Sequence, residues 1–196
     1  MTAISADRPL VLASGSRYRA ELLRRLGVDF IVDVAGVDET ALPDEAPAAL
    51  AARLALAKAR AVSARHPERW VLGSDQVAAA GTARLGKPGT VERATAQLRL
   101  LSGGSAQFYT AIALVHGPRT LTALDTTVVR FRALSGGEID RYVAAEPALD
   151  CAGSFKCEGL GITLMQAVET RDPTALVGLP LIALRQLLAQ AGCALP

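Results

Sequence analysis

The stretch Leu12-Ala13-Ser14-Gly15-Ser16-Arg17-Tyr18-Arg19 sets an apolar run directly before small hydroxyl residues and two arginines. The apolar residues 10–13 predict a buried strand, and Ser16 is a favourable N-cap for a helix that begins after it. A strand-to-helix turn exposes backbone N–H groups, and Arg19 can hold a phosphate through two parallel hydrogen bonds, with the Ser14 hydroxyl nearby. Taken alone, the stretch fits a capped helix with solvated arginines better than a phosphate site. The Walker pattern GxxxxGK[ST] does not occur.

A second segment, Gly73-Ser74-Asp75-Gln76, follows the apolar residues 70–72 and precedes Leu85-Gly86-Lys87-Pro88. Asp75 at the end of a buried strand can bind a divalent cation or accept a proton from an attacking water. Lys87 can neutralise phosphate charge. The plainer interpretations are an aspartate that caps a turn and an exposed loop lysine. Together, the two segments suit a site that holds a polyphosphate and activates water beside it.

The composition excludes several classes of protein. The chain has 196 residues, of which 51% are hydrophobic, so it can bury a sizeable core. A net charge of +2, from 21 basic and 19 acidic residues, is too balanced for charge-driven nucleic-acid binding. The three cysteines form no even framework and no CxxC, which indicates free thiols in a reducing compartment. A zinc site is not expected, because neither of the two histidines stands at ligand spacing to a cysteine pair. Because no signal peptide and no apolar run of about eighteen residues are seen, we expect a cytoplasmic protein outside the membrane.

Strands and helices alternate early in the chain, and strands then follow one another in the middle. Predicted strands cover residues 10–13, 30–37, 70–72, 107–116 and 121–133, and a hairpin is predicted over 78–87. One helix is predicted after Ser16, a second from Pro47, a third over 91–101, a fourth after a capping box at Ser135–Glu138, and a fifth over 181–190. This order predicts an α/β protein with a mixed sheet. We expect one domain over residues 1–196, in which a boundary near 103–107 would separate two lobes.

Many segments, in the same order, resemble those of the Maf family of nucleoside triphosphate pyrophosphatases. The matching segments are Leu12-Ala13-Ser14-x-Ser16-x-x-Arg19, Val37-Asp38-Glu39, Leu56-Ala57-Lys58-Ala59, Gly73-Ser74-Asp75-Gln76, Leu85-Gly86-Lys87-Pro88, Tyr109-Thr110-Ala111, Asp150 to Lys156, Glu158 to Gly161, and Gly178-Leu179-Pro180. Arg17 is a departure, because the family usually has proline there. So many ordered matches are far more specific than any one motif.

The resemblance implies a fold and a reaction. The implied fold is an elongated mixed sheet flanked by helices, with two lobes and a central cleft. The implied reaction hydrolyses a nucleoside triphosphate to its monophosphate and pyrophosphate with Mg²⁺ or Mn²⁺, in a homodimer. Asp75 would be the proton acceptor and, with Glu39, would support the metal. The residues that would hold the substrate are Ser14, Ser16, Arg19, Lys58, Lys87 and Lys156.

Three positions that the resemblance ties to substrate choice fall on Tyr18, Gln76 and Glu158. The branch that acts on 7-methyl-GTP has an aromatic residue, a glutamine and a glutamate there, as this sequence does. N7-methylation makes guanine cationic, so an aromatic ring such as Tyr18 attracts it. Glu158 can accept hydrogen bonds from the N1–H and amino groups of the base.

Two alternatives remain open at the level of sequence. One is a dTTP and UTP pyrophosphatase of the same family, against which Tyr18, Gln76 and Glu158 argue. The other is a nucleotide-sensing regulator of septum formation without turnover. Retention of Asp75 favours an enzyme, because a sensor need not keep the proton acceptor.

Overall fold

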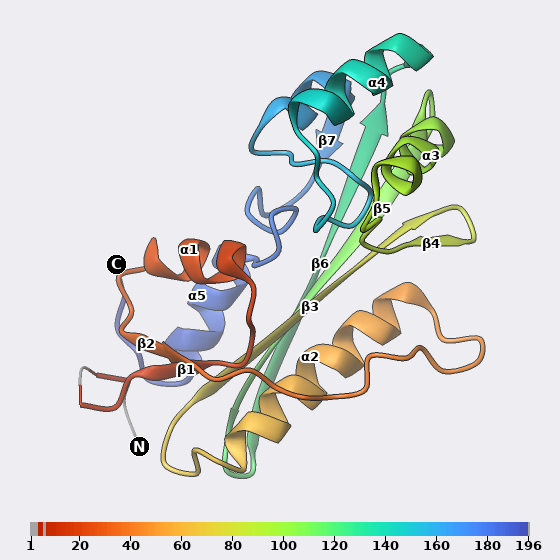
Figure 1. The fold of residues 1–196 in the computed structure, drawn as a ribbon. Helices are drawn as coiled ribbons and strands as arrows, with labels where there is room; N and C mark the ends of the chain where they lie inside the picture. Colours follow the sequence, from red (N-terminus) through yellow and green to blue (C-terminus); the bar gives the residue numbers. More distant parts are fainter. Residues whose placement is uncertain (1–3, 6, 196) are drawn as a thin grey trace. The chain divides into compact units, whose positions relative to one another are not determined.

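The computed structural model describes residues 4–5 and 7–195. The described chain runs through β1 (Leu10–Leu12), α1 (Arg17–Arg24), β2 (Phe30–Val32), α2 (Pro47–Ser63), β3 (Val71–Ala80), β4 (Ala83–Leu85), α3 (Val91–Leu101), β5 (Ser105–His116), β6 (Arg119–Phe131), α4 (Gly136–Ala145), a 3₁₀ helix η1 (Leu160–Leu164), β7 (Met165–Glu169) and α5 (Leu181–Gln190). Figure 1 shows these elements in the colours of the sequence. Among the described residues, no helix is both long and apolar enough to cross a membrane.

The strands follow the order β2-β1-β3-β5-β6-β7, and β4 pairs with β3. β1 is parallel to both β2 and β3, whereas the pairs β3–β4 and β6–β7 are antiparallel. The predicted mixed α/β sheet is therefore confirmed. A hairpin explains the antiparallel β3–β4 pair, because a short turn can join only neighbouring strands that run in opposite directions. The strands β6 and β7 are instead connected through α4 and η1.

The chain divides into two compact units, which share β3, β5 and β6. The first unit takes the described residues of Met1–Gln76, Thr110–Asp125 and Asp172–Pro196, and the second takes Val77–Tyr109 and Thr126–Arg171. One division between the units falls between Tyr109 and Thr110, directly after the segment 103–107 near which we expected a boundary.

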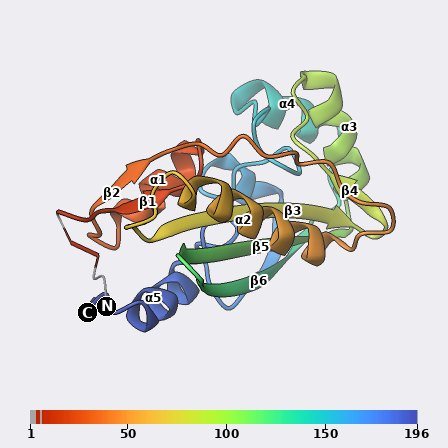
Figure 2. The same cartoon turned by 90° about the horizontal axis from the view of Figure 1, so that it is seen from below.

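In the first unit, helices cover both faces of the sheet, with α2 on one face and α1 and α5 on the other (Figures 1 and 2). Alternate residues of each strand point to opposite faces. The α1 and α5 face is a single apolar cluster, whose members include Leu10, Leu12, Leu22, Leu23, Leu72, Ile112, Leu114, Leu184, Leu187 and Leu188. The strands are apolar on both faces because each face meets a helix.

The second unit has an aromatic core under its helices. Phe155 lies edge-on to both Phe108 and Phe131, with ring centroids 5.6 and 5.4 Å apart. Helices α3 and α4 contact each other. The predicted capping box of α4 is confirmed, because Ser135 and Glu138 each bind the other's backbone N–H.

Two predicted strand boundaries were wrong. The strand that begins at Phe30 ends at Val32, not at residue 37. Beyond it, the guanidinium of Arg65 binds the Asp33 carboxylate and the backbone carbonyl of Val34, at 2.7 and 3.1 Å. The Arg65 side chain thus occupies the Val34 carbonyl oxygen, which in a longer strand would accept a hydrogen bond from a neighbouring strand.

The strand that we expected over residues 70–72 extends over Val71–Ala80, so Asp75 lies within β3 and not at its end. Apolar periodicity missed this because Gly73, Ser74 and Asp75 interrupt the hydrophobic run. β7 was not predicted at all, since Met165 is the only residue of that strand that is buried.

Candidate functional site

A buried lysine of α2 joins two carboxylates of the first unit. Lys58 Nζ lies 2.6 Å from Asp75 Oδ1 and 2.6 Å from Glu39 Oε1. The side chains of Lys58 and Asp75 are each only 10% exposed, whereas that of Glu39 is 61% exposed. The Lys58–Asp75 pair is therefore held in a region of low dielectric, and Glu39 forms the solvent side of the cluster.

Helix α2 can bring Lys58 to Asp75 because Gly73 has no side chain. Gly73 and Asp75 point to the same face of β3, since they are two residues apart. A Cβ on Gly73 would lie 2.1 Å from the carbonyl oxygen of Ala55 and 2.7 Å from the backbone nitrogen of Ala59, both in α2. The helix thus rests on the glycine backbone, one turn from the lysine.

The first predicted phosphate segment lies between β1 and α1. Arg19 Nη1 donates to Ser14 Oγ at 3.1 Å, and Arg19 Nε donates to the carbonyl oxygen of Gly178 at 3.0 Å. Burial lowers the pKa of the Arg19 guanidinium, while the charges of Asp75 and Glu39 act in the opposite direction. Arg19 therefore belongs to the same charged group as the two carboxylates.

Ser16 has the capping role that the sequence predicts. Its hydroxyl accepts from the backbone N–H of Arg19 at 3.4 Å, at the start of α1. Ser14 Oγ accepts from the backbone N–H of Ser16 at 3.2 Å. Both hydroxyls thus organise the turn that presents the arginine.

Tyr18 is half-buried and already has a cationic neighbour. The Arg17 guanidinium lies 4.8 Å from the centre of the Tyr18 ring, and its Nη2 donates to the phenolic oxygen at 2.8 Å. The ring thus offers a π-face to a cation, as the sequence suggested.

Gln76 lies on the face of β3 opposite to Asp75. Its Nε2 lies 3.0 Å from Thr110 Oγ1, 3.0 Å from the carbonyl oxygen of Ala175 and 3.1 Å from that of Leu176. The neighbouring Ser74 hydroxyl donates to the carbonyl oxygen of Gly178 at 3.2 Å. β3 therefore carries polar residues on both faces: Asp75 on one, and Ser74 and Gln76 on the other.

The carboxylates of Glu39 and Asp75 fit a divalent cation that is bound together with substrate. Among the described residues, no group of three His, Cys, Asp or Glu side chains could by itself hold a metal. Mg²⁺ commonly takes only one or two carboxylates and completes its shell with water and substrate phosphates. Lys58 uses one oxygen of each carboxylate. The donor set suits Mg²⁺ or Mn²⁺ better than zinc.

Three predicted site residues belong to the second unit. Lys87 is exposed in the loop after β4, Lys156 is half-buried, and Glu158 is exposed. The backbone N–H of Lys156 donates to the hydroxyl of Tyr142 at 3.1 Å, and Glu158 Oε2 accepts from the Cys157 thiol at 3.3 Å. Their roles toward a ligand stay predictions of the sequence.

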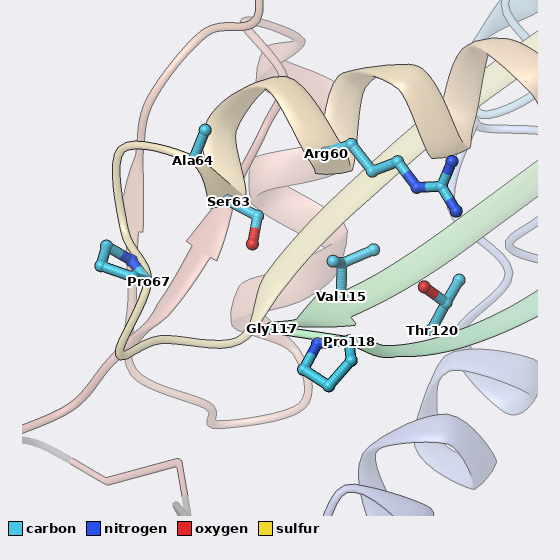
Figure 3. A pocket seen from close by; sticks show the side chains of 8 residues that line it. All are labelled: Arg60, Ser63, Ala64, Pro67, Val115, Gly117, Pro118 and Thr120. Atoms are coloured by element: carbon cyan, nitrogen blue, oxygen red, sulfur yellow. The ribbon is translucent and has the colours of Figure 1, made fainter.

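An open pocket in the first unit lies apart from these residues. It is formed by the C-terminal end of α2, the loop after it, and the turn between β5 and β6, as Figure 3 shows for Arg60, Pro67, Pro118 and Thr120. None of the site residues predicted from the sequence lines it.

The loop before α5 had no predicted role in the site. Its carbonyl groups at Ala175, Leu176 and Gly178 receive hydrogen bonds from Arg19 and Gln76. The motif Gly178-Leu179-Pro180 could be seen in the sequence. The role of the loop could not be predicted, because its acceptors are backbone carbonyl groups, which every residue type has.

The fold is that of Ham1 proteins. The Ham1 protein of Staphylococcus aureus superposes with a TM-score of 0.52 at 17% identity, covering 93% of this chain and 97% of that one. A Ham1 protein from Coxiella burnetii gives a TM-score of 0.51 at 20% identity, covering 94% and 98%.

The chain belongs to the Maf-like protein family, which matches residues 9–191. It is 59% identical to the 7-methyl-GTP pyrophosphatase of Xanthomonas axonopodis pv. citri, over 95% of this chain and 98% of that protein. It is 52% identical to the 7-methyl-GTP pyrophosphatase of Bordetella pertussis, over 93% and 92%. The family predicted from the sequence motifs is thereby confirmed.

Proposed function

We propose that this protein hydrolyses 7-methyl-GTP to 7-methyl-GMP and pyrophosphate. The observation that carries the proposal is the Lys58 ammonium, 2.6 Å from the Asp75 carboxylate and within one charged group with Arg19. The names of relatives at 52–60% identity over nearly the whole chain support the same substrate.

In the proposed reaction, Asp75 accepts the proton of a water that attacks the α-phosphorus. The Lys58 ammonium holds the direction of that carboxylate by donating to Oδ1. Glu39, which is exposed, releases Lys58 when the triphosphate arrives, so that the ammonium can donate to phosphate oxygens. Arg19 neutralises charge that grows on the pyrophosphate as it leaves. A divalent cation bound at the carboxylates would supply further charge neutralisation.

The base is proposed to be chosen by Tyr18, Gln76 and Glu158. A ring that already attracts the Arg17 cation suits the positive charge of 7-methylguanine. Glu158 complements that charge and accepts from the donor edge of guanine. Lys87 and Lys156 add positive charge for the phosphates.

Pyrophosphate release from 7-methyl-GTP, GTP, dTTP, UTP and CTP, each with Mg²⁺ or Mn²⁺, tests the proposal. We expect a clear preference for 7-methyl-GTP and loss of all turnover in Asp75→Asn, with the fold retained. A preference for dTTP and UTP would keep the enzyme and reject the substrate. Near-normal activity of Asp75→Asn would reject the proton acceptor.

A further inference from the structure

The loop between β7 and α5 supplies backbone acceptors to two side chains of the proposed nucleotide site. The carbonyl oxygen of Gly178 receives Arg19 Nε at 3.0 Å and the Ser74 hydroxyl at 3.2 Å. A guanidinium that is tethered through Nε and, at Nη1, through Ser14 keeps one fixed direction. The direction of Arg19 therefore depends on where Gly178 lies.

The same loop fixes the amide of Gln76. Its Nε2 faces the carbonyl oxygens of Ala175 and Leu176 and the hydroxyl of Thr110, which itself donates to Ala175 O at 2.9 Å. All three neighbours act as acceptors toward the amide, so the NH₂ end must face the loop. Oε1 then points away from the loop and presents an acceptor.

A buried carboxylate at the start of the loop holds it in place. Asp172 is 2% exposed. Its Oδ1 accepts from the backbone N–H of Thr174 at 3.0 Å and from the Thr174 hydroxyl at 2.6 Å, and its Oδ2 accepts from the backbone N–H of Ile182 at 2.6 Å. Asp172 thus ties both ends of the loop to one side chain.

Asp172 and Thr174 also cap α5 from outside the helix. The N-cap residue, Pro180, makes no side-chain cap, and the first N–H groups of a helix need acceptors. Thr174 Oγ1 accepts from Leu181 N–H at 2.9 Å, and Asp172 accepts from Ile182 N–H. A carboxylate at this end is also favoured by the helix dipole.

We propose that Asp172 is a positioning residue of the nucleotide site. By anchoring the loop and the start of α5, it sets the carbonyl groups that orient Arg19 and Gln76. This inference rests on the proposed function, in which Arg19 meets phosphate and Gln76 helps to choose the base. In this role Asp172 acts through the loop and the start of α5, to which its carboxylate oxygens are bonded.

The variant Asp172→Asn isolates the effect, because it keeps the shape and replaces one oxygen by NH₂. Whichever way the new amide is turned, its NH₂ group replaces one of the two acceptor oxygens. That NH₂ group then faces the backbone N–H of either Ile182 or Thr174, so one of these two hydrogen bonds is lost. Asp29→Asn, at an exposed position of the same unit, is the matched control. Thr174→Val, with Thr174→Ser as the conservative rescue, weakens the same anchor if Asp172→Asn does not fold.

Kinetics give the first readout. We expect KM to rise and kcat/KM for 7-methyl-GTP to fall about 10- to 100-fold in Asp172→Asn, because a misplaced Arg19 weakens substrate binding. The preference for 7-methyl-GTP over dTTP should shrink, since Gln76 is no longer held. The control and Thr174→Ser should behave like the parent protein. Lower activity with an unchanged base preference would overturn the proposal and leave Asp172 a purely structural residue.

The Gln76 side-chain NH₂ signals in ¹⁵N-labelled protein give a readout that needs no turnover. In the parent protein we expect slow hydrogen exchange of these protons, and in Asp172→Asn fast exchange in a folded protein. The Gln76→Met variant assigns the signals. Unchanged exchange in Asp172→Asn would overturn the proposal even if catalysis suffers. If the parent protein releases no pyrophosphate, the proposed function fails, while the exchange data still decide whether Asp172 orients Gln76.

Discussion

Replacing Gly73 by alanine should separate α2 from β3 and thereby disturb the charged site. The added Cβ would lie 2.1 Å from Ala55 O, a backbone atom that no side-chain rotation can move. The helix must shift by nearly 1 Å to bring this contact even to 3.0 Å. Such overpacking costs about 1–3 kcal/mol. For a chain of this length we expect the melting temperature to fall by about 2 to 12 °C.

The shift should reach catalysis through Lys58. Lys58 lies in α2 and Asp75 in β3, and their side chains are 2.6 Å apart, so a shift of the helix changes this contact directly. A displacement of about 1 Å between catalytic groups can lower the rate by about 100-fold. Thermal unfolding followed by circular dichroism gives the stability, and pyrophosphate release at a temperature well below the transition gives kcat/KM.

Gly36→Ala is the matched control, because a Cβ on Gly36 would meet nothing within 4 Å. We expect that variant to match the parent protein in stability and in rate. If Gly73→Ala melts at the parent temperature and keeps full activity, then α2 does not rest on β3 as closely as the distances indicate, and the reasoning is refuted.

Three further predictions address the cap, the second unit and the aromatic ring. Hydrogen bonds within the capping box lower the pKa of Glu138 to about 2 from its usual 4.5. The contribution of the ionised Glu138 carboxylate to stability is therefore present above pH ~4.5 and is lost as the pH falls toward 2. We expect the melting temperature of Glu138→Gln to depend less on pH in that window than the melting temperature of the parent protein. Tyr142→Phe removes the acceptor of the Lys156 backbone N–H, and we expect chemical denaturation to show a loss of about 1–2 kcal/mol. Arg17→Ala removes a cation from the Tyr18 ring, so KM for 7-methyl-GTP should fall a few-fold while KM for dTTP changes little; equal changes for both would contradict a cation–π role.

Local signals in the sequence were sufficient for most helices. Ser16, Thr90 and Ser135 each cap a helix through their side chains, because a cap satisfies N–H groups within a few residues of itself. Pro47 opens α2 without a side-chain cap, at a position where its missing N–H costs nothing. The helix over 181–190 was also predicted correctly. The ends of strands were predicted less well than the ends of helices. A strand is held by hydrogen bonds to other strands, and the residues of those strands lie far away in the sequence.

The residue types of the site were likewise visible in the sequence, through motifs that resemble one family. The sequence named Glu39, Lys58 and Asp75 as participants. It did not show that Lys58 is buried between the two carboxylates, because that contact joins a loop, a helix and a strand across Gly73.

The sequence by itself thus determined the mixed α/β architecture and the family, and it predicted the charged residues of the proposed site. Only the tertiary structure revealed Asp172 and the carbonyl groups of the loop before α5, which orient Arg19 and Gln76. The physical reason is that periodicity and capping act between near neighbours in the chain. Backbone acceptors acquire their role when the fold brings residues about 100 or more positions apart within hydrogen-bond distance.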